Sequence, residues 1–286
     1  MSLLAPHNHH SYFVTNGSVG AAAGAQAGTL ITSGGSANTA GTWTQIHAGL
    51  TYGCDYLIVR INAVETSADV ITATTLNAYI DIGIGASSGA VMTVIEKLGA
   101  SQAQGMGVVY FLPIRIPPDT PVWARHQNTA ASAKAGVQVS WFGGNMNPYS
   151  FPNFSGMVAL GAVSASTTGT SITPGATGAE GSWAQIVAST ADDYGGVMAS
   201  PLFNVDTTLT SGLHTTIDVG LGASGQEKVI GENLTQQFMW SSAEQKDAVC
   251  FPSFVGIKAG SRLAARASGS TTADGTNSII LYGFKH

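Results

Sequence analysis

Three glycines in the second half of the chain form the pattern with the most obvious chemical meaning. The stretch TTIDVGLGASGQ at 215–226 places Gly220, Gly222 and Gly225 in G-x-G-x-x-G spacing after a β-branched run. At this spacing, backbone N–H groups can approach a pyrophosphate at the N-terminus of a helix. Such a site also needs a βαβ unit and an acidic residue about 20 positions further on. The surroundings are rich in Thr and Gly and indicate two strands joined by a turn, so we predict a turn and no cofactor site.

A second catalytic spacing, G-x-S-x-G, occurs at 85–89, with Ser87 at the position that the nucleophile takes in α/β-hydrolases. The two patterns occupy matched positions of an internal repeat. Ser88 breaks the first pattern in one copy, and Gln226 breaks the second pattern in the other. Because neither pattern is present in both copies, we predict a shared structural turn and no catalytic residue.

The histidines and cysteines offer little metal chemistry. Histidine is a common metal ligand, but a metal site needs fixed geometry. Three histidines lie close together in the N-terminal segment, where we expect no fixed structure: His7, His9 and His10. Three others are isolated and have no histidine counterpart in the other copy: His47, His126 and His214. The two cysteines, Cys54 and Cys250, are far apart and are expected to be buried free thiols. We therefore predict no metal site.

The composition indicates a β-protein with a neutral polar surface. Only 9% of the 286 residues are charged, against about 25% in an average protein, and 36 residues are glycine. A helical protein needs many Lys, Glu and Arg on its outer faces, whereas strands can present Thr, Ser and Asn and close their turns with Gly. The net charge is −5 and the 11 basic residues are scattered, which argues against nucleic acid as a partner. No signal peptide or membrane-spanning run is visible, so no membrane association is predicted.

The chain is an internal duplication with an offset of 137 to 142 residues. Five collinear matches carry this inference: GTLIT at 28–32 with GTSIT at 169–173, GTWTQI at 41–46 with GSWAQI at 181–186, IDIGIGAS at 80–87 with IDVGLGAS at 217–224, IPPDTPVWAR at 116–125 with IKAGSRLAAR at 257–266, and VSWFGG at 139–144 with IILYGF at 279–284. These matches divide the chain into a flexible arm, a first repeat, a linker expected to lie against a surface, and a second repeat: 1–27, 28–144, 145–168 and 169–286.

Each repeat is predicted to be an antiparallel β-sandwich of jelly-roll type, so that the whole chain is all-β. In the first repeat, short runs that alternate apolar with polar residues indicate eight strands: Thr29–Thr32, Trp43–His47, Tyr56–Ala63, Asn77–Gly83, Val91–Glu96, Val108–Ile114, Pro121–Gln127 and Val137–Phe142. Eight short strands in one unit fit two packed sheets. Two brief stretches are helix-like, around Val94–Leu98 and Glu227–Leu234.

Few polar side chains recur at matched positions of the two repeats. Asp81 with Arg125 matches Asp218 with Arg266, and Trp43 matches Trp183. One interpretation is a ligand site built twice, with the tryptophans as sugar-stacking platforms. The other is an ion pair that fixes the edge of each sandwich, with the tryptophans packed in the core or between sheets. We favour the structural interpretation for all six residues.

The succession of a GxGA turn, an I-P-x-x-T/S-x-x-x-A-R segment and a closing strand with a glycine resembles a repeat found in tailed-bacteriophage virion structural proteins. The residues that carry this resemblance are 83–86, 116–125 and 139–143, and in the second copy 220–223, 257–266 and 279–283. Lys258 stands where the first copy has Pro117, so the second match is looser. The resemblance implies a non-enzymatic component present in many copies on a virion that is assembled in the host cytoplasm. Its partners would be copies of itself and other virion proteins, either major capsid or tail proteins.

Three functions remain open at this point. The first is a virion structural protein: a capsid decoration or cement component, a head fibre, or a tail or baseplate part. The second is a carbohydrate-binding adhesion module that takes a host surface glycan, which an exposed aromatic cluster beside polar amides would favour. The third is an enzyme, which a concave pocket with a carboxylate or histidine of perturbed pKa would favour.

Overall fold

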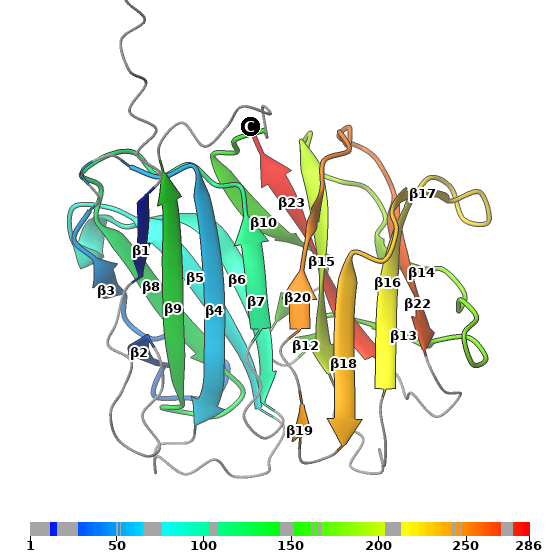
Figure 1. Ribbon diagram of the computed structural model, residues 1–286, viewed down its shortest axis with the longest axis horizontal. Coiled ribbons are helices and arrows are strands. Elements are labelled where there is room, and N and C mark those ends of the chain that lie inside the picture. Colours follow the sequence, from blue (N-terminus) through cyan, green and yellow to red (C-terminus); the bar gives the residue numbers. More distant parts are fainter. Residues whose placement is uncertain are drawn as a thin grey trace, which may run out of the picture.

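The computed structural model describes most of both repeats (Figure 1). The residues that it describes are 12–15, 28–49, 51, 53–65, 76–102, 108–143, 152–161, 163–164, 167–203, 213–241, 244–245, 248–269 and 277–286. Over these residues the secondary structure is β, apart from one three-residue 3-10 turn, η1 (Ser88–Ala90). The prediction of an all-β chain is confirmed. No helix within the described ranges is long and apolar enough to cross a membrane.

The first repeat has the strand order of a jelly roll, and all eight predicted strands are present. They are β2 (Thr29–Thr32), β3 (Thr44–His47), β4 (Tyr56–Glu65), β5 (Leu76–Ile84), β6 (Met92–Gln102), β7 (Val108–Leu112), β8 (Val122–Asn128) and β9 (Lys134–Gly143). One sheet runs β2-β9-β4-β7 and the other runs β3-β8-β5-β6. The first and last strands are therefore neighbours, as in a jelly roll built from Greek keys. Inward and outward residues alternate along these strands, most regularly along β8.

The second repeat has the same order with some strands divided. Its strands are β13 (Thr170–Ile172), β14 (Ala184–Val187), β15 (Gly196–Phe203), β16 (Leu213–Leu221), β17 (Lys228–Gly231), β18 (Thr235–Ser241), β19 (Glu244–Gln245), β20 (Ala248–Cys250), β21 (Pro252–Ser253), β22 (Leu263–Gly269) and β23 (Asn277–Lys285). β17 and β18 together correspond to β6, because they pair with β16 as β6 pairs with β5.

Both sheets continue from one repeat into the other, which differs from two sandwiches joined by a linker. β7 pairs in parallel with its own counterpart β20, so the first sheet runs β1-β9-β4-β7-β20-β18-β16-β22-β14. The second sheet runs β21-β15-β23-β10-β6-β5-β8-β3. Apart from β7 and β20, the strands that correspond in the two repeats lie in opposite sheets. Figure 1 shows the strands of the second sheet crossing obliquely behind those of the first.

The segment expected as a linker contributes to this junction. β10 (Gly156–Leu160) pairs with β23 and makes one parallel bridge to β6, between Met157 and Ile95. The ring of Phe154 is buried and stacks on Phe284, with 5.1 Å between centroids. The same segment also forms the two-stranded hairpin β11 (Val163–Ser164) and β12 (Thr167–Thr168). Residues 156–160 are therefore part of the sheet, because the open edges of β6 and β23 both need a partner.

The N-terminal segment is described only over β1 (Tyr12–Thr15), which pairs with β9 in the position that β10 takes beside β23. The remainder of 1–27 lies outside the described residues, and so do the three N-terminal histidines. The arm predicted over 1–27 therefore contains one paired strand.

Both helix-like predictions are wrong. Val94–Leu98 lies inside β6, and 227–234 contains β17 and a turn. In each place the chain bulges at one residue with positive φ, Lys97 at 52° and Asn233 at 51°. A residue inserted into a strand interrupts the period of two and imitates a helical pattern.

The match of the closing strands shifts by two residues in the structure. Tyr56 pairs with Phe142, and the corresponding Gly196 pairs with Phe284. Residues 139–143 therefore correspond to 281–285, and not to 279–283 as the sequence suggested.

Candidate functional site

The recurring residues of the first repeat form one cluster on an outer face, which we name the Asp81 cluster: Trp43, Asp81, Lys97 and Arg125. Asp81 points outward from β5 because its neighbours Ile80 and Ile82 point into the core. Arg125 lies opposite it on β8, and its Nε donates to Asp81 Oδ2 over 2.7 Å. The guanidinium lies 4.6 Å from the ring centroid of Trp43, at cation–π distance.

The second oxygen of Asp81 holds the bulge in β6. The backbone N–H of Lys97 donates to Asp81 Oδ1 over 2.8 Å. The positive φ of Lys97 is a backbone conformation that costs free energy unless its surroundings support it. Asp81 therefore links three strands: its own, the strand with Arg125 and the bulged strand.

The second repeat builds the same arrangement from Trp183, Asp218, Arg266 and Asn233, and adds Glu180; these five residues are the Asp218 cluster. Arg266 donates from Nε and Nη2 to Asp218 Oδ2 over 3.2 and 3.1 Å. The N–H of Asn233 donates to Asp218 Oδ1 over 2.9 Å, and Arg266 lies 4.5 Å from the Trp183 centroid. Arg266 also pairs with Glu180.

Glu180 gives the Asp218 cluster a second carboxylate around one guanidinium. The pKa of Glu180 is raised above its ordinary value by desolvation and by the adjacent Asp218 carboxylate, which outweigh Arg266. The side chain of Glu180 is 41% exposed, while that of Asp218 is 6% exposed. Because so exposed a group loses little hydration, the neighbouring Asp218 carboxylate is the main cause of this raised pKa. In the first repeat the corresponding residue is Ala40, which makes the same isolated bridge.

The first glycine of each GxG motif makes room for an indole. A Cβ on Gly220 would lie 2.8 Å from Cζ3 of Trp183, and a Cβ on Gly83 would lie 3.1 Å from Cη2 of Trp43. The second glycine ends the strand, and its carbonyl is bonded in both repeats. Gly85 O accepts from Trp123 Nε1 over 2.7 Å, and Gly222 O accepts from Arg262 Nη1 over 3.0 Å. The G-x-G-x-x-G glycines thus serve packing and a turn between β16 and β17, and no helix follows them.

The G-x-S-x-G serine has no catalytic surroundings within the described residues. Ser87 is exposed, precedes η1 and makes no capping hydrogen bond. Its carbonyl accepts from the N–H of Ala90, which closes the turn. A nucleophile needs a base within hydrogen-bond reach, and none of the described side chains provides one.

His126 is buried without a role in either cluster. Its Nδ1 lies 3.3 Å from Ile31 O, and its Nε2 lies 3.3 Å from Asn128 Nδ2. Burial lowers its pKa to about 4. The corresponding residue of the second repeat is Ala267, so this buried histidine belongs to the first repeat alone.

The described residues offer no arrangement that a metal or a thiol reaction would need. Within these ranges no group of three or more His, Cys, Asp or Glu residues could hold a metal ion. Cys54 and Cys250 are buried thiols that form no disulfide, as expected. Burial raises the pKa of Cys54 to about 12, which keeps it protonated at neutral pH.

Sequence reasoning found Trp43, Asp81 and Arg125 with their counterparts because they recur, and the structure brings each set together. The expectation that the tryptophans pack in the core or between sheets is wrong, because both lie half-buried on the outer face under an arginine. It missed Lys97 and Asn233, which act through backbone N–H groups and leave no side-chain signal. It also missed Trp123 and Arg262. These residues occupy different positions in the two repeats but donate to the equivalent glycine carbonyls.

Comparisons with known proteins give only distant likenesses. No protein-family model matches the chain, and no curated protein matches it. Among solved structures, PNGF-II is 7% identical with a TM-score of 0.34, over 96% of this chain and 65% of that one. The STIV MCP is 8% identical with a TM-score of 0.32, over 90% of this chain and 96% of that one. The T=3 Penaeus vannamei nodavirus structure is 9% identical with a TM-score of 0.26, over 96% of this chain and 90% of that one. With TM-scores this low, the assignment of the jelly roll rests on the strand order of this chain itself.

Proposed function

We propose that the protein is a non-enzymatic structural component of a virion surface, most specifically a capsid decoration, cement or head-fibre protein of a tailed phage. The observation that carries the proposal is the fusion of two jelly rolls into one block through shared sheets. A block of this kind offers broad, rigid faces without a hinge between its halves. Broad rigid faces suit a subunit that must pack repeatedly against identical neighbours.

The polar groups at matched positions support the same proposal. Asp81, Asp218 and both arginines are already engaged in bonds within the fold. Such groups stabilise the outer faces and have little capacity left for a substrate. A surface with few charges also limits repulsion between packed copies.

The test is whether purified particles contain the chain in stoichiometric amounts. Quantitative mass spectrometry of gradient-purified virions should find it in many copies, and electron microscopy with an antibody should place it on the head. Labelling on the tail would replace the decoration role by the tail or baseplate alternative. Particles that lack the chain would refute a virion role.

A carbohydrate-binding module is the second candidate, and one observation favours it. Trp43 and Trp123 are half-buried in the first repeat, and Trp123 lies opposite the exposed Gln45 on the neighbouring strand β3. Aromatic rings beside amides are the usual components of a sugar site. Binding to a glycan array that Trp123→Ala abolishes, and Met92→Ala leaves intact, would support this role.

A further inference from the structure

One face of the second repeat is an interface within this chain. The outward-facing residues of β15 and β23 are fully buried: Met198, Ser200, Ile280, Tyr282 and Phe284. Apart from Ser200, they belong to the same hydrophobic cluster as the core of the first repeat. β23 is accordingly buried on both of its faces, whereas the outward residues of β9 are partly exposed.

Hydrogen bonds fix the first repeat on this face. Tyr282 Oη donates to Lys97 O over 2.8 Å and accepts from the N–H of Gly99 over 2.9 Å. The hydroxyls of Tyr110 and Ser200 lie 2.7 Å apart. The rings of Tyr110 and Tyr282 meet edge to face, with 6.2 Å between centroids. This face therefore binds a jelly roll that is related to its own by the internal duplication.

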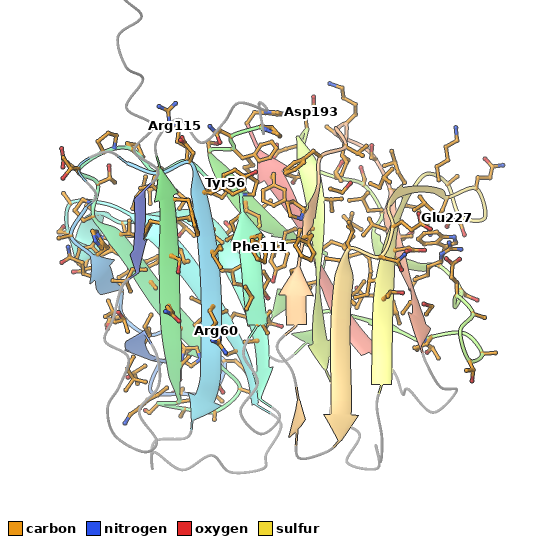
Figure 2. The ribbon with its side chains drawn as sticks, viewed as in Figure 1. Tyr56, Arg60, Phe111, Arg115, Asp193 and Glu227 are labelled. Carbon is orange, nitrogen blue, oxygen red and sulfur yellow. The ribbon has the colours of Figure 1, made fainter. Side chains whose placement is uncertain are left out.

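The corresponding face of the first repeat remains partly exposed. The strand registers equate Ile58 with Met198, Ser140 with Tyr282 and Phe142 with Phe284. We define the β4 face as six of the outward side chains of β4, β7 and β9: Tyr56, Ile58, Arg60, Phe111, Ser140 and Phe142. Figure 2 shows Tyr56, Arg60 and Phe111 along β4 and β7.

The β4 face carries four large, partly exposed aromatic or aliphatic side chains. Phe111 lies opposite Ile58, and Tyr56 lies opposite Phe142, so large apolar side chains are neighbours across three strands. The ring of Phe111 stacks on Phe251, 5.3 Å away and nearly parallel, and Phe251 is 47% exposed. Contiguous apolar surface of this kind marks an interaction site. Through Phe251, it is continuous with the junction between the repeats.

We infer that the β4 face is the docking site for a second copy of this chain. Two observations point to a copy over another partner: the equivalent face is already occupied by this chain's own jelly roll, and the exposed patch continues the edge of that intramolecular interface. The two faces differ at one edge, because β7 pairs with β4 in the first repeat whereas β20 pairs with β18 in the second. The inference deepens the proposed virion role, because such a role requires contacts between copies.

The test is the oligomeric state of the full chain, measured by sedimentation velocity across about 1–100 µM, where interfaces of standard size are resolved. The parent should self-associate. Ile58→Asp and Ser140→Arg should each weaken association at least about tenfold, since a charge in the centre of an interface is costly. Met92→Asp is the matched control, because Met92 is 62% exposed on the other sheet. It should leave association unchanged.

Circular dichroism and melting temperature separate lost association from lost folding, and Ser140→Arg keeps the test valid if Ile58→Asp unfolds. A monomeric parent, or an oligomer that resists Ser140→Arg, overturns the inference. If virions contain the chain but these variants do not change its oligomers, the virion role is retained and the β4 face is rejected. Oligomers that dissociate on substitution, with no chain in virions, would do the reverse.

Discussion

The Asp81 and Asp218 clusters share their central bonds and differ in everything around them. In both, one carboxylate accepts from the N–H of a bulge and from an arginine, and the arginine lies over an indole. Around this centre, the second repeat adds Glu180 where the first has Ala40. We therefore infer that the centre, which links three strands, serves the fold itself, while the periphery follows the surroundings of each repeat.

The glycine that follows β5 and the one that follows β16 show the same division between a shared bond and a variable partner. Gly85 O takes its hydrogen bond from an indole and Gly222 O from a guanidinium that also donates to Glu227 and Gln185. The unsatisfied carbonyl must find a donor in both repeats. Which residue supplies that donor differs, so the first repeat presents an apolar surface there and the second a charged one.

Substitution of the glycine under each indole should have the largest effect and tests whether the two centres are equally required. Gly83→Val should cost about 3 kcal/mol, because its Cβ would lie 2.3 Å from Val91 Cγ1 and 2.8 Å from Met92 O. Gly220→Val should cost a similar amount through Trp183. Urea denaturation measures both. Gly89→Ala, with nothing within 4 Å of its Cβ, is the control. A stable Gly220→Val variant that instead lost nucleotide affinity would revive the phosphate-binding interpretation.

Acid should destabilise the first repeat through His126, for which the second repeat has alanine. The pKa of His126 is about 4 in the folded chain and about 6.5 when unfolded, so the unfolded state takes up the proton first as the pH falls. Stability should therefore fall by up to about 3 kcal/mol between pH 6.5 and pH 4. Chemical denaturation at pH steps through this window measures the slope. His126→Gln should reduce this slope, and an unchanged slope in that variant would contradict the assignment.

The two arginines should be of unequal importance. Arg266→Ala leaves Asp218 and Glu180 without their shared cation and should cost about 2 kcal/mol. Arg125→Ala leaves one carboxylate that still accepts from Lys97, and Arg125 is 35% exposed, so a cost of about 1 kcal/mol is expected. Arg266→Lys keeps the charge but loses the flat contact with Trp183, so its stability should lie between those of the parent and Arg266→Ala. If neither alanine variant alters the melting temperature, the clusters are not structural and a ligand role returns.

The sequence predicted the strands well because alternation and turn glycines act locally. The eight strands of the first repeat follow from this pattern. The six recurring residues were identified because the duplication supplies a comparison within one chain. Their backbone partners at Lys97 and Asn233 were missed, since a bulge is a property of pairing and not of one strand.

Two further features could not be predicted from the sequence: the junction between the repeats and an exchange of large and small residues in their cores. The parallel pairing of β7 with β20 uses backbone groups and has no side-chain signature. In the core, buried Trp141 and Cys54 of the first repeat correspond to Gly283 and Tyr194 of the second, where the Tyr194 ring occupies the space above Gly283. The bulky aromatic side chain thus comes from β9 in the first repeat, and from the segment before β15 in the second. Such a compensation is visible only once the registers are known.

The smallest expected effect belongs to Glu180, the residue that most clearly separates the two clusters. Its raised pKa means that the folded state binds the proton more tightly than the unfolded chain does, so the ionised form is disfavoured by folding at neutral pH. Glu180→Gln should therefore leave stability within about 0.5 kcal/mol of the parent, despite the ion pair with Arg266. Denaturation in low and high salt measures this, because salt lowers stability when it screens a stabilising ion pair and raises stability when it screens a repulsive carboxylate pair. Asp218→Asn is the contrasting variant. It removes the negative charge that accepts from the Asn233 N–H and pairs with Arg266, so it should be clearly destabilising. A loss above about 1 kcal/mol for Glu180→Gln would make the added carboxylate a structural part of the second repeat and not a feature of its surface.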